Sequence, residues 1–295
     1  MLERAALREQ ARAFRSAVRD RAGDVERLGA ALHGRLLAPL SLRPGEAIVV
    51  VPHDVLHYMP FHALRAPGGW VVEERAVSYA PSVSAAAHLL GRAPRPRRHL
   101  LALGNPDLGS ARMALPAAQR EVQSVQALFP GAEAHIGAAA TKARLLARAA
   151  DGEIIHLAAH ADVDEIDPLY STIHLARSER TPGDLEAHEV YRLVLPRAGL
   201  VTLSACDTGG GRVSRGDEIW GFTRAFLSAG SSTLLVSLWP VEDEATARTM
   251  EAFYREVRTG PARTALRAAQ LAVLRERRTA HPFFWAPFVL VGDVR

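Results

Sequence analysis

The sequence predicts an α/β fold in which helices cover both faces of a mainly parallel β-sheet. Short apolar segments alternate with longer helical segments over most of the 295 residues, and this alternation is typical of parallel sheets with helical crossovers. Several strand segments are apolar along their whole length, as in Leu200–Ser204, which is expected of strands that are buried on both faces. Hydrophobic residues make up 48% of the chain, enough to form a large core.

The N-terminal third predicts helices followed by a few strands. Residues 2–38 are rich in Ala, Leu, Arg and Glu with apolar residues at helical spacing, which predicts one or two helices. The apolar run Ala47–Val51 lies between Gly and Pro and predicts a buried strand. Two further strands are predicted at Trp70–Val77 and Val77–Ala80. A helix is predicted from Pro81 to Leu90.

A stretch rich in proline and arginine, Arg92–Arg98, marks the expected boundary between two parts of the chain. After it, strands and helices alternate regularly. The predicted strands are His99–Gly104, Ala132–Ile136, Ile154–Ala158, Thr172–Ala176, Leu200–Ser204, Thr233–Leu238 and Phe288–Val291. The predicted helices are Ala117–Phe129, Lys142–Ala150 with Thr141 as its N-cap, Glu218–Ala229, Asp243–Arg258 and Arg263–Arg277.

Charge and composition argue against several functional classes. The chain has 36 Lys and Arg against 32 Asp and Glu, a net charge of +4. Basic residues gather only in Arg92–Arg98, whose prolines predict a loop, so direct binding of nucleic acid is not expected. The single cysteine excludes an internal disulfide framework. No apolar run approaches the roughly 20 residues that cross a bilayer, and the N-terminus lacks the apolar centre of a secretory signal. We therefore expect a cytoplasmic protein.

Reactive side chains follow two of the predicted strands at their carboxyl ends, where the sites of parallel sheets gather. His160 follows Ile154–Ala158, and Cys206 follows Leu200–Ser204. Cys206 precedes Asp-Thr-Gly-Gly-Gly, a turn whose backbone amides can lower a thiol pKa and donate to an oxyanion. The 46 residues between the histidine and the cysteine (206 − 160) approach the spacing of about 50 in caspases. The pattern predicts Cys206 as nucleophile and His160 as its general base, although a lone cysteine is often only a small buried hydrophobe.

Other histidines raise the question of a metal site. On a helix His156 and His160 would share a face, but on a strand their Cα atoms lie about 13 Å apart. We therefore interpret His156 as a buried structural histidine. His53, His57 and His62 lack an accompanying cysteine or glutamate and are assigned to a turn between strands. Neither phosphate-binding glycine motif, G-x-x-x-x-G-K-[ST] or G-x-G-x-x-G, is present, so no metal or cofactor is expected.

Several strings, in order along the chain, resemble the CHAT family of caspase-like cysteine peptidases, which are often attached to tetratricopeptide repeats. The matching strings are Leu36–Leu64, Ile155–Ala161 (IHLAAHA), Pro168–Ser171 (PLYS), Leu203–Gly209 (LSACDTG), Gly216–Gly230, Ser237–Ala247 and His281–Asp293. The resemblance implies a three-layer α/β/α sandwich of the caspase type. It also implies an N-terminal helical segment at 1–40, an inactive pseudo-caspase-like lobe at 41–98 and a catalytic lobe at 99–295.

The resemblance further implies that Cys206 attacks a peptide carbonyl and that His160 passes the proton to the leaving amine. The backbone amides of Cys206 and Ala161 would form the oxyanion hole. The family usually has Gly after the histidine, and Ala161 resists a positive φ. If the hole needs a positive φ there, one donor is misaligned, which costs roughly 10²–10³ in rate.

Two alternatives to a cysteine endopeptidase remain open from the sequence. The departure at Ala161, together with an Arg-rich N-terminal helix, favours a catalytically weak or inactive CHAT-fold module that binds proteins. An acyl hydrolase or transferase of small molecules could use the same dyad, but no motif supports it.

Substrate and partners are less clearly indicated by the sequence. A pocket for a basic P1 side chain would use Asp162, Asp207 and Glu218, although a solvated loop is the more common explanation for such acidic residues. Trp239 would line the substrate cleft or pack in the core. Because the relatives often carry helical repeats, we expect a regulatory protein, of the tetratricopeptide type or another sensor, that keeps the peptidase latent until a signal arrives.

Overall fold

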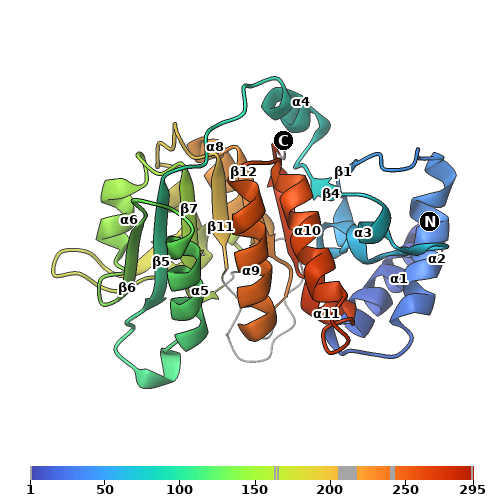
Figure 1. The fold of residues 1–295 in the computed structure, drawn as a ribbon, viewed down its shortest axis with the longest axis horizontal. Helices are drawn as coiled ribbons and strands as arrows, with labels where there is room; N and C mark the ends of the chain where they lie inside the picture. The colour runs from blue at the N-terminus through green and yellow to red at the C-terminus, as the bar shows by residue number, and fades with distance from the viewer. Residues whose placement is uncertain (1, 163, 165, 205–217, 240–242, 294) are drawn as a thin grey trace.

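We analysed a computed structural model that describes residues 2–162, 164, 166–204, 218–239, 243–293 and 295 (Figure 1). Its centre is an eight-stranded sheet. In spatial order the strands are β1 (Ile48–Val50), β4 (Val77–Tyr79), β13 (Phe288–Gly292), β12 (Thr233–Ser237), β11 (Leu200–Leu203), β7 (Ile154–Ala158), β5 (Leu100–Pro106) and β6 (Glu133–Gly137).

Two parallel blocks make up this sheet. The strands β12, β11, β7, β5 and β6 are parallel to one another, and β1, β4 and β13 form a second parallel block. The blocks meet at the antiparallel pair β12–β13. Strands from before and after the Arg92–Arg98 stretch therefore share one sheet. The expected α/β architecture with a mainly parallel sheet is confirmed.

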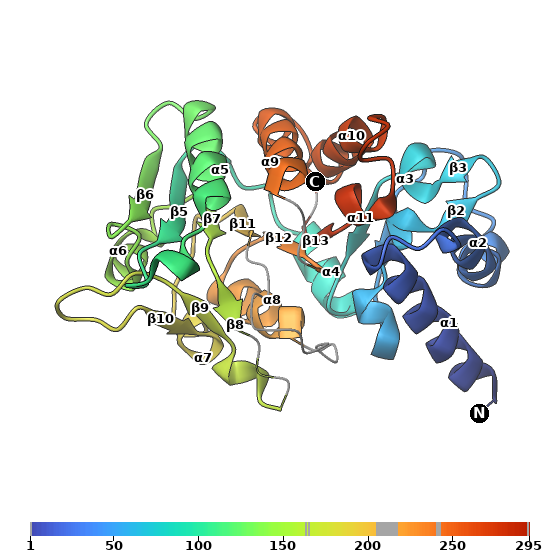
Figure 2. The ribbon, with the colours of Figure 1, turned by 90° about the horizontal axis from the view of Figure 1, so that it is seen from below.

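Helices cover both faces of the sheet (Figure 2). One face packs against α5 (Pro116–Ala127), α9 (Asp243–Val257) and α10 (Ala262–Leu274). The other packs against α6 (Lys142–Arg148), α7 (Ala187–Val190) and α8 (Glu218–Ala229). The remaining helices are α1 (Leu2–Arg19), α2 (Val25–Leu36), α3 (Val71–Glu74), α4 (Val83–Leu90) and α11 (Pro282–Trp285).

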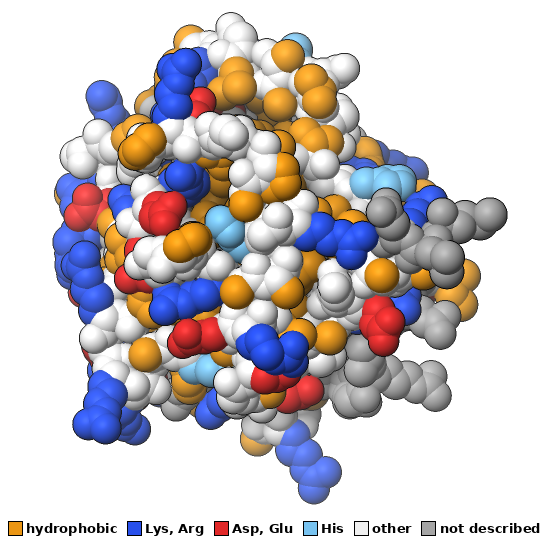
Figure 3. Space-filling model, turned by 90° about the vertical axis from the view of Figure 1, so that its right-hand side faces the viewer, with side chains coloured by type: hydrophobic (Ala, Val, Ile, Leu, Met, Phe, Trp, Pro, Cys, Tyr) orange, Lys and Arg blue, Asp and Glu red, His pale blue; other side chains and the backbone are white. Residues whose placement is uncertain are grey.

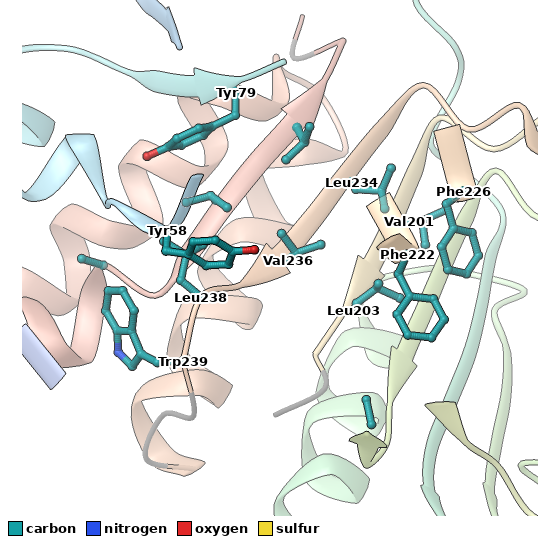
Figure 4. Packing of buried hydrophobic residues seen from close by; sticks show 14 of the residues in the cluster. Tyr58, Tyr79, Val201, Leu203, Phe222, Phe226, Leu234, Val236, Leu238 and Trp239 are labelled. Atoms are coloured by element: carbon teal, nitrogen blue, oxygen red, sulfur yellow. The ribbon is translucent and has the colours of Figure 1, made fainter. Parts of the chain in front are cut away.

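Two hydrophobic clusters, one on each face of the sheet, are formed by side chains that alternate along the strands. Val201 and Leu203 of β11 belong to the cluster that also holds Phe222 and Phe226 of α8 (Figure 4). Leu200 belongs to the cluster on the α5, α9 and α10 face. Successive side chains of a strand point to opposite faces, so a continuously apolar strand supplies both layers.

Helix α5 approaches the sheet closely because β5 contains a glycine. A Cβ added at Gly104 would lie 2.5 Å from the Cγ2 atom of Val122. The small residue therefore sets the distance between α5 and the sheet. Helix α5 carries a buried carboxylate, that of Glu121, against β7 and β11.

Two small sheets complete the fold. The strands β8 (Ala161–Asp162), β9 (Thr172–His174) and β10 (Asp184–Glu186) form an antiparallel sheet. A short antiparallel pair, β2 (Arg65–Ala66) and β3 (Gly69–Trp70), lies in the N-terminal part.

Most predicted elements are confirmed, including two N-terminal helices. The strand β7 has the predicted bounds Ile154–Ala158. Thr141 caps α6 as expected, because its hydroxyl accepts the N–H of Arg144 at 3.1 Å.

Three sequence-based predictions are wrong in whole or in part. The segment Trp70–Val77 is not a strand, because Val71–Glu74 form helix α3, whose first turn is stabilised by Glu73 accepting the Trp70 N–H at 2.6 Å. The strand predicted at Thr172–Ala176 is confirmed over Thr172–His174, but it pairs with β8 and β10 in the small antiparallel sheet and not in the main sheet. The predicted strand Ala47–Val51 lies at the edge of the main sheet, so Val49 is 43% exposed rather than buried.

The face formed by the N-terminal helices mixes arginine, carboxylate and apolar side chains (Figure 3). Arg4 and Arg8 of α1 both contact the Asp54 carboxylate, and Arg27 pairs with Asp24. These arginines are thus neutralised locally. No helix in the described part of the chain combines the length and apolar character needed to cross a membrane.

Candidate active site

The candidate site lies where β7 and β11 end. The two strands are parallel neighbours in a register that pairs Leu157 with Leu203. The pairing continues one residue further, because the Ser204 N–H donates to the Leu157 carbonyl at 2.9 Å. Carboxyl ends of parallel strands share one edge of a sheet. The segment 205–217, which holds Cys206 and Asp207, lies outside the described residues.

His160 is buried at this edge, with 6% of its surface exposed. Its Nε2 lies 2.9 Å from the carbonyl oxygen of Met113. A carbonyl can only accept, so Nε2 carries a proton and Nδ1 is the basic nitrogen of the neutral ring. The orientation suits a general base that acts through Nδ1.

The loop that carries Met113 is itself held in place. Asn105, at the end of β5, accepts the N–H of Leu115 through its side-chain oxygen at 2.6 Å. Its amide nitrogen donates to Gln119 at 3.2 Å. Sequence reasoning missed the role of Met113, since a backbone carbonyl leaves no side-chain signal.

Ala161 follows the histidine as the first residue of β8. It is not among the described non-glycine residues with positive φ, so no left-handed conformation is needed here. The His174 N–H donates to the His160 carbonyl, which makes the next pair, Ala161 and Ile173, a non-hydrogen-bonded pair. In such a pair the N–H points away from the partner strand. The Ala161 amide thus points away from β9.

Asp162 takes part in a carboxylate–histidine–carboxylate arrangement across the small sheet. His174 on β9 contacts Asp162 through Nε2 at 2.9 Å and Asp184 through Nδ1 at 2.8 Å. Both ring nitrogens can donate only when the imidazole is protonated. Burial by itself lowers the pKa of His174, but the hydrogen bonds with Asp184 and Asp162 outweigh it and raise the pKa.

We expect His174 to titrate above its ordinary pKa of 6.5, as followed by NMR of its ring protons. Asp162→Asn should lower this pKa, because it removes one charge-assisted hydrogen bond. Asp164→Asn is the matched control, since Asp164 accepts backbone N–H groups of its own loop and not the imidazole. Equal pKa values in both variants would contradict the assignment.

The stability of the folded state should follow the same titration. The folded pKa of His174 is raised above the unfolded value of 6.5. Its stabilising contribution is therefore complete below about pH 6.5 and is lost as the pH rises through the folded pKa.

Of the other predicted site residues, only Trp239 has a described side chain. Trp239 is buried and its indole N–H donates to the Phe283 carbonyl at 3.1 Å, within the core shown in Figure 4. Glu218 is the first residue of α8, and its side chain is outside the described part. Among the described residues, the predicted site residues at the end of β7 are the consecutive His160, Ala161 and Asp162.

Among the histidines of the N-terminal part, His62 has a backbone partner. His62 is buried and its ring donates to the Ala286 carbonyl at 3.0 Å. Within the described ranges, no group of three or more His, Cys, Asp or Glu side chains is arranged to hold a metal.

A buried polar network lies behind the two strand ends, on the face covered by α5 and α9. Glu121 of α5 accepts from the Ser204 hydroxyl at 3.0 Å, and its other oxygen lies 3.0 Å from Nε2 of His156, without the alignment of a full hydrogen bond. Nδ1 of His156 lies 2.9 Å from the Tyr254 hydroxyl, which donates to Thr202 at 2.6 Å. His156 is fully buried, as predicted. No motif or spacing in the sequence indicated Glu121.

Comparison with protein families gives a match to the CHAT domain over residues 26–293. Two similar proteins are both called tetratricopeptide repeat protein 28. The Mus musculus protein is 27% identical over 301 aligned residues, covering 83% of this chain. The Homo sapiens protein is 30% identical over 231 residues, covering 65% of this chain. The chain spans only 12% and 9% of the length of these relatives.

Two solved structures with a similar fold illustrate the likeness. The separase–securin complex of Saccharomyces cerevisiae matches with a TM-score of 0.56 and 14% identity, over 83% of this chain and 15% of that chain. The Arg-specific cysteine proteinase gingipain R matches with a TM-score of 0.50 and 9% identity, over 83% and 56%. At this identity the likeness concerns the fold, which is caspase-like.

Proposed function

The chain belongs to the CHAT domain family, and we propose that it is a caspase-like cysteine endopeptidase with Cys206 as nucleophile and His160 as general base. One observation carries the proposal. The register of β7 and β11 pairs Leu157 with Leu203, and counting three residues onward along the sequence from each of them gives His160 and Cys206. The two reactive residues thus follow equivalent positions of neighbouring parallel strands.

The orientation of His160 supports the proposed chemistry. Because Nε2 is engaged by the Met113 carbonyl, Nδ1 takes the thiol proton. The Cys206 thiolate then attacks the substrate carbonyl, and a carbon–sulfur bond forms. The imidazolium returns the proton to the leaving amine as the peptide carbon–nitrogen bond breaks. Water, deprotonated by the same imidazole, hydrolyses the thioester and restores the enzyme.

The oxyanion of this reaction would be bound by the backbone amides of Ala161 and Cys206. The extended conformation of Ala161 and the direction of its N–H away from β9 support this role. Alanine is accommodated at negative φ, so the departure from glycine is compatible with catalysis.

The proposal also covers the substrate specificity of the peptidase and its regulation. A preference for a basic P1 side chain is proposed to come from Asp162, Asp207 and Glu218. Of these, Asp162 also contacts His174. Trp239 is proposed to border the substrate cleft. A protein partner, of the tetratricopeptide type or another sensor, is proposed to release the peptidase from a latent state in the cytoplasm. The relatives that contain tetratricopeptide repeats support this part of the proposal.

The proposal is tested by labelling with a library of peptidyl acyloxymethyl ketones, which modify a competent thiolate. We expect wild type to be labelled, Cys206→Ala not to be labelled, and His160→Ala to be labelled at least 10²-fold more slowly, because a general base contributes about 10²–10⁴. Ala161→Gly should not increase labelling, since Ala161 already has negative φ.

The main alternative, a protein-binding module without catalysis, predicts a different result. Labelling would then be absent in wild type and in Ala161→Gly, both alone and with a candidate activator. Labelling or peptide cleavage that survives Cys206→Ala would contradict the proposed nucleophile.

A further inference from the structure

We propose that Glu121 is a positioning residue for the proposed dyad, because its carboxylate ties the strand that leads to His160 to the strand that leads to Cys206. The inference rests on the function proposed above. It adds a residue of helix α5 that acts on the reacting groups through the two strands and does not touch the substrate.

The two contacts of Glu121 reach the two strand ends. One carboxylate oxygen accepts from Ser204 at 3.0 Å, and Ser204 comes directly after β11, two residues before Cys206. The other oxygen lies 3.0 Å from Nε2 of His156, which belongs to β7 and precedes His160 by four residues. A single side chain thus bridges neighbouring strands close to where each one leaves the sheet.

A second bridge closes these contacts into a ring. Thr202 and His156 are paired in the register of β11 and β7, and the hydroxyl of Tyr254 contacts both side chains. Burial raises the pKa of Tyr254, so its hydroxyl keeps the proton that it donates to Thr202. The ring runs from Glu121 through His156, Tyr254 and Thr202, and returns along β11 to Ser204.

The hydroxyl of Tyr254 sets the orientation of the His156 ring. Since this hydroxyl donates to Thr202, its oxygen accepts from Nδ1 of His156, and the remaining nitrogen, Nε2, lies 3.0 Å from the Glu121 carboxylate. This contact lacks the alignment of a full hydrogen bond. The Ser204 hydroxyl therefore makes the aligned hydrogen bond to Glu121, and the imidazole lies in close contact beside it.

Core stability does not explain this arrangement. Glu121 is 4% exposed and His156 is fully buried, and burying ionisable groups carries a desolvation penalty that often exceeds their mutual attraction. Apolar residues of similar volume would fill this space between apolar neighbours at no net cost. What they could not supply is a directional tie between two strands, and this is the role that we assign to Glu121.

The thiol pKa of Cys206 is the quantity that such a positioning role controls. A nearby imidazolium lowers the pKa of a thiol, so a misplaced His160 allows the thiol pKa to rise towards its ordinary value of about 8.5. Cys206 is the only cysteine in the chain. Alkylation by iodoacetamide as a function of pH therefore reports this pKa without any need for peptidase activity.

We expect Glu121→Leu, which removes both ties, to raise the thiol pKa by about one unit, corresponding to up to tenfold slower alkylation near neutral pH. Ser204→Ala removes one tie at a partly exposed site and should shift the pKa in the same direction by less. The Ser204→Ala variant allows the same measurement if the Glu121→Leu protein does not fold.

Glu153→Leu is the matched control. Glu153 is also a buried carboxylate next to β7, but it lies at the opposite end of that strand and accepts from the Arg98 and His99 amides and from Arg197. Its loss should reduce stability without changing the thiol pKa. An unchanged pKa in the Glu121→Leu or Ser204→Ala protein, or an equal shift in Glu153→Leu, would overturn the positioning role.

His160→Ala separates this inference from the proposed function. If His160→Ala leaves the thiol pKa unchanged, the dyad itself is wrong, and the positioning role falls with it. If His160→Ala raises the pKa but the Glu121 and Ser204 variants do not, only the positioning role is wrong.

Discussion

Replacing Trp285 with alanine is expected to lower the free energy of unfolding by about 3–5 kcal/mol, the usual cost of deleting a large buried aromatic side chain. Trp285 is fully buried in α11, and its indole N–H donates to the Ala280 carbonyl at 3.0 Å. The ring also makes edge contacts with Trp70 and His62, at centroid distances of 5.7 and 6.1 Å. The side chain therefore joins the N-terminal segment to the C-terminal part of the chain.

Chemical denaturation measures this loss. Phe283→Ala is the control, because Phe283 lies in the same short helix but is only partly buried and packs against Arg21. Its replacement should cost clearly less. Equal losses in the two variants would show that Trp285 does not hold the segments together.

Acidification is expected to destabilise the protein through His62. Burial lowers the pKa of His62 to about 4, against an ordinary value of 6.5. Between these values the unfolded chain binds a proton that the folded protein excludes. The free energy of unfolding therefore falls as the pH decreases from about 6.5 to about 4. The difference of roughly 2.5 pKa units corresponds to roughly 3 kcal/mol.

The measurement compares the free energy of unfolding between pH 4 and 7 in wild type and His62→Gln. Glutamine can still donate to the Ala286 carbonyl but does not titrate, so the variant should lose this part of the pH dependence. Its stability at pH 7 should also fall, because the ring contact with Trp285 is lost. If both proteins show the same slope, another group causes the acid sensitivity.

Local sequence patterns determined much of the fold. The apolar run Ile154–Ala158 forms β7 with the predicted bounds, and Thr141 caps α6 as its side-chain chemistry requires. The Cys206–His160 dyad stays a prediction, made because two reactive residues come shortly after two strands. Each of these inferences depends on neighbours in the sequence or on the general rule for the edges of parallel sheets.

Local sequence patterns did not predict which strands pair with one another. The segment Thr172–His174 has the composition of a strand, but its pairing with β8 and β10 places it outside the main sheet. Val49 is exposed because β1 lies at the sheet edge. Strand composition reports burial on average, whereas the position in the sheet decides it for each strand.

The sequence by itself determined the fold class, the family resemblance and the expectation that Cys206 and His160 act together. Only the tertiary structure decided which atoms orient His160, since its partner is a backbone carbonyl of Met113, 47 residues away. Tertiary structure also assembled Glu121, His156 and Tyr254 from α5, β7 and α9. Hydrogen bonds of this kind join residues that are distant in sequence, and no local pattern of polarity or spacing encodes such partners.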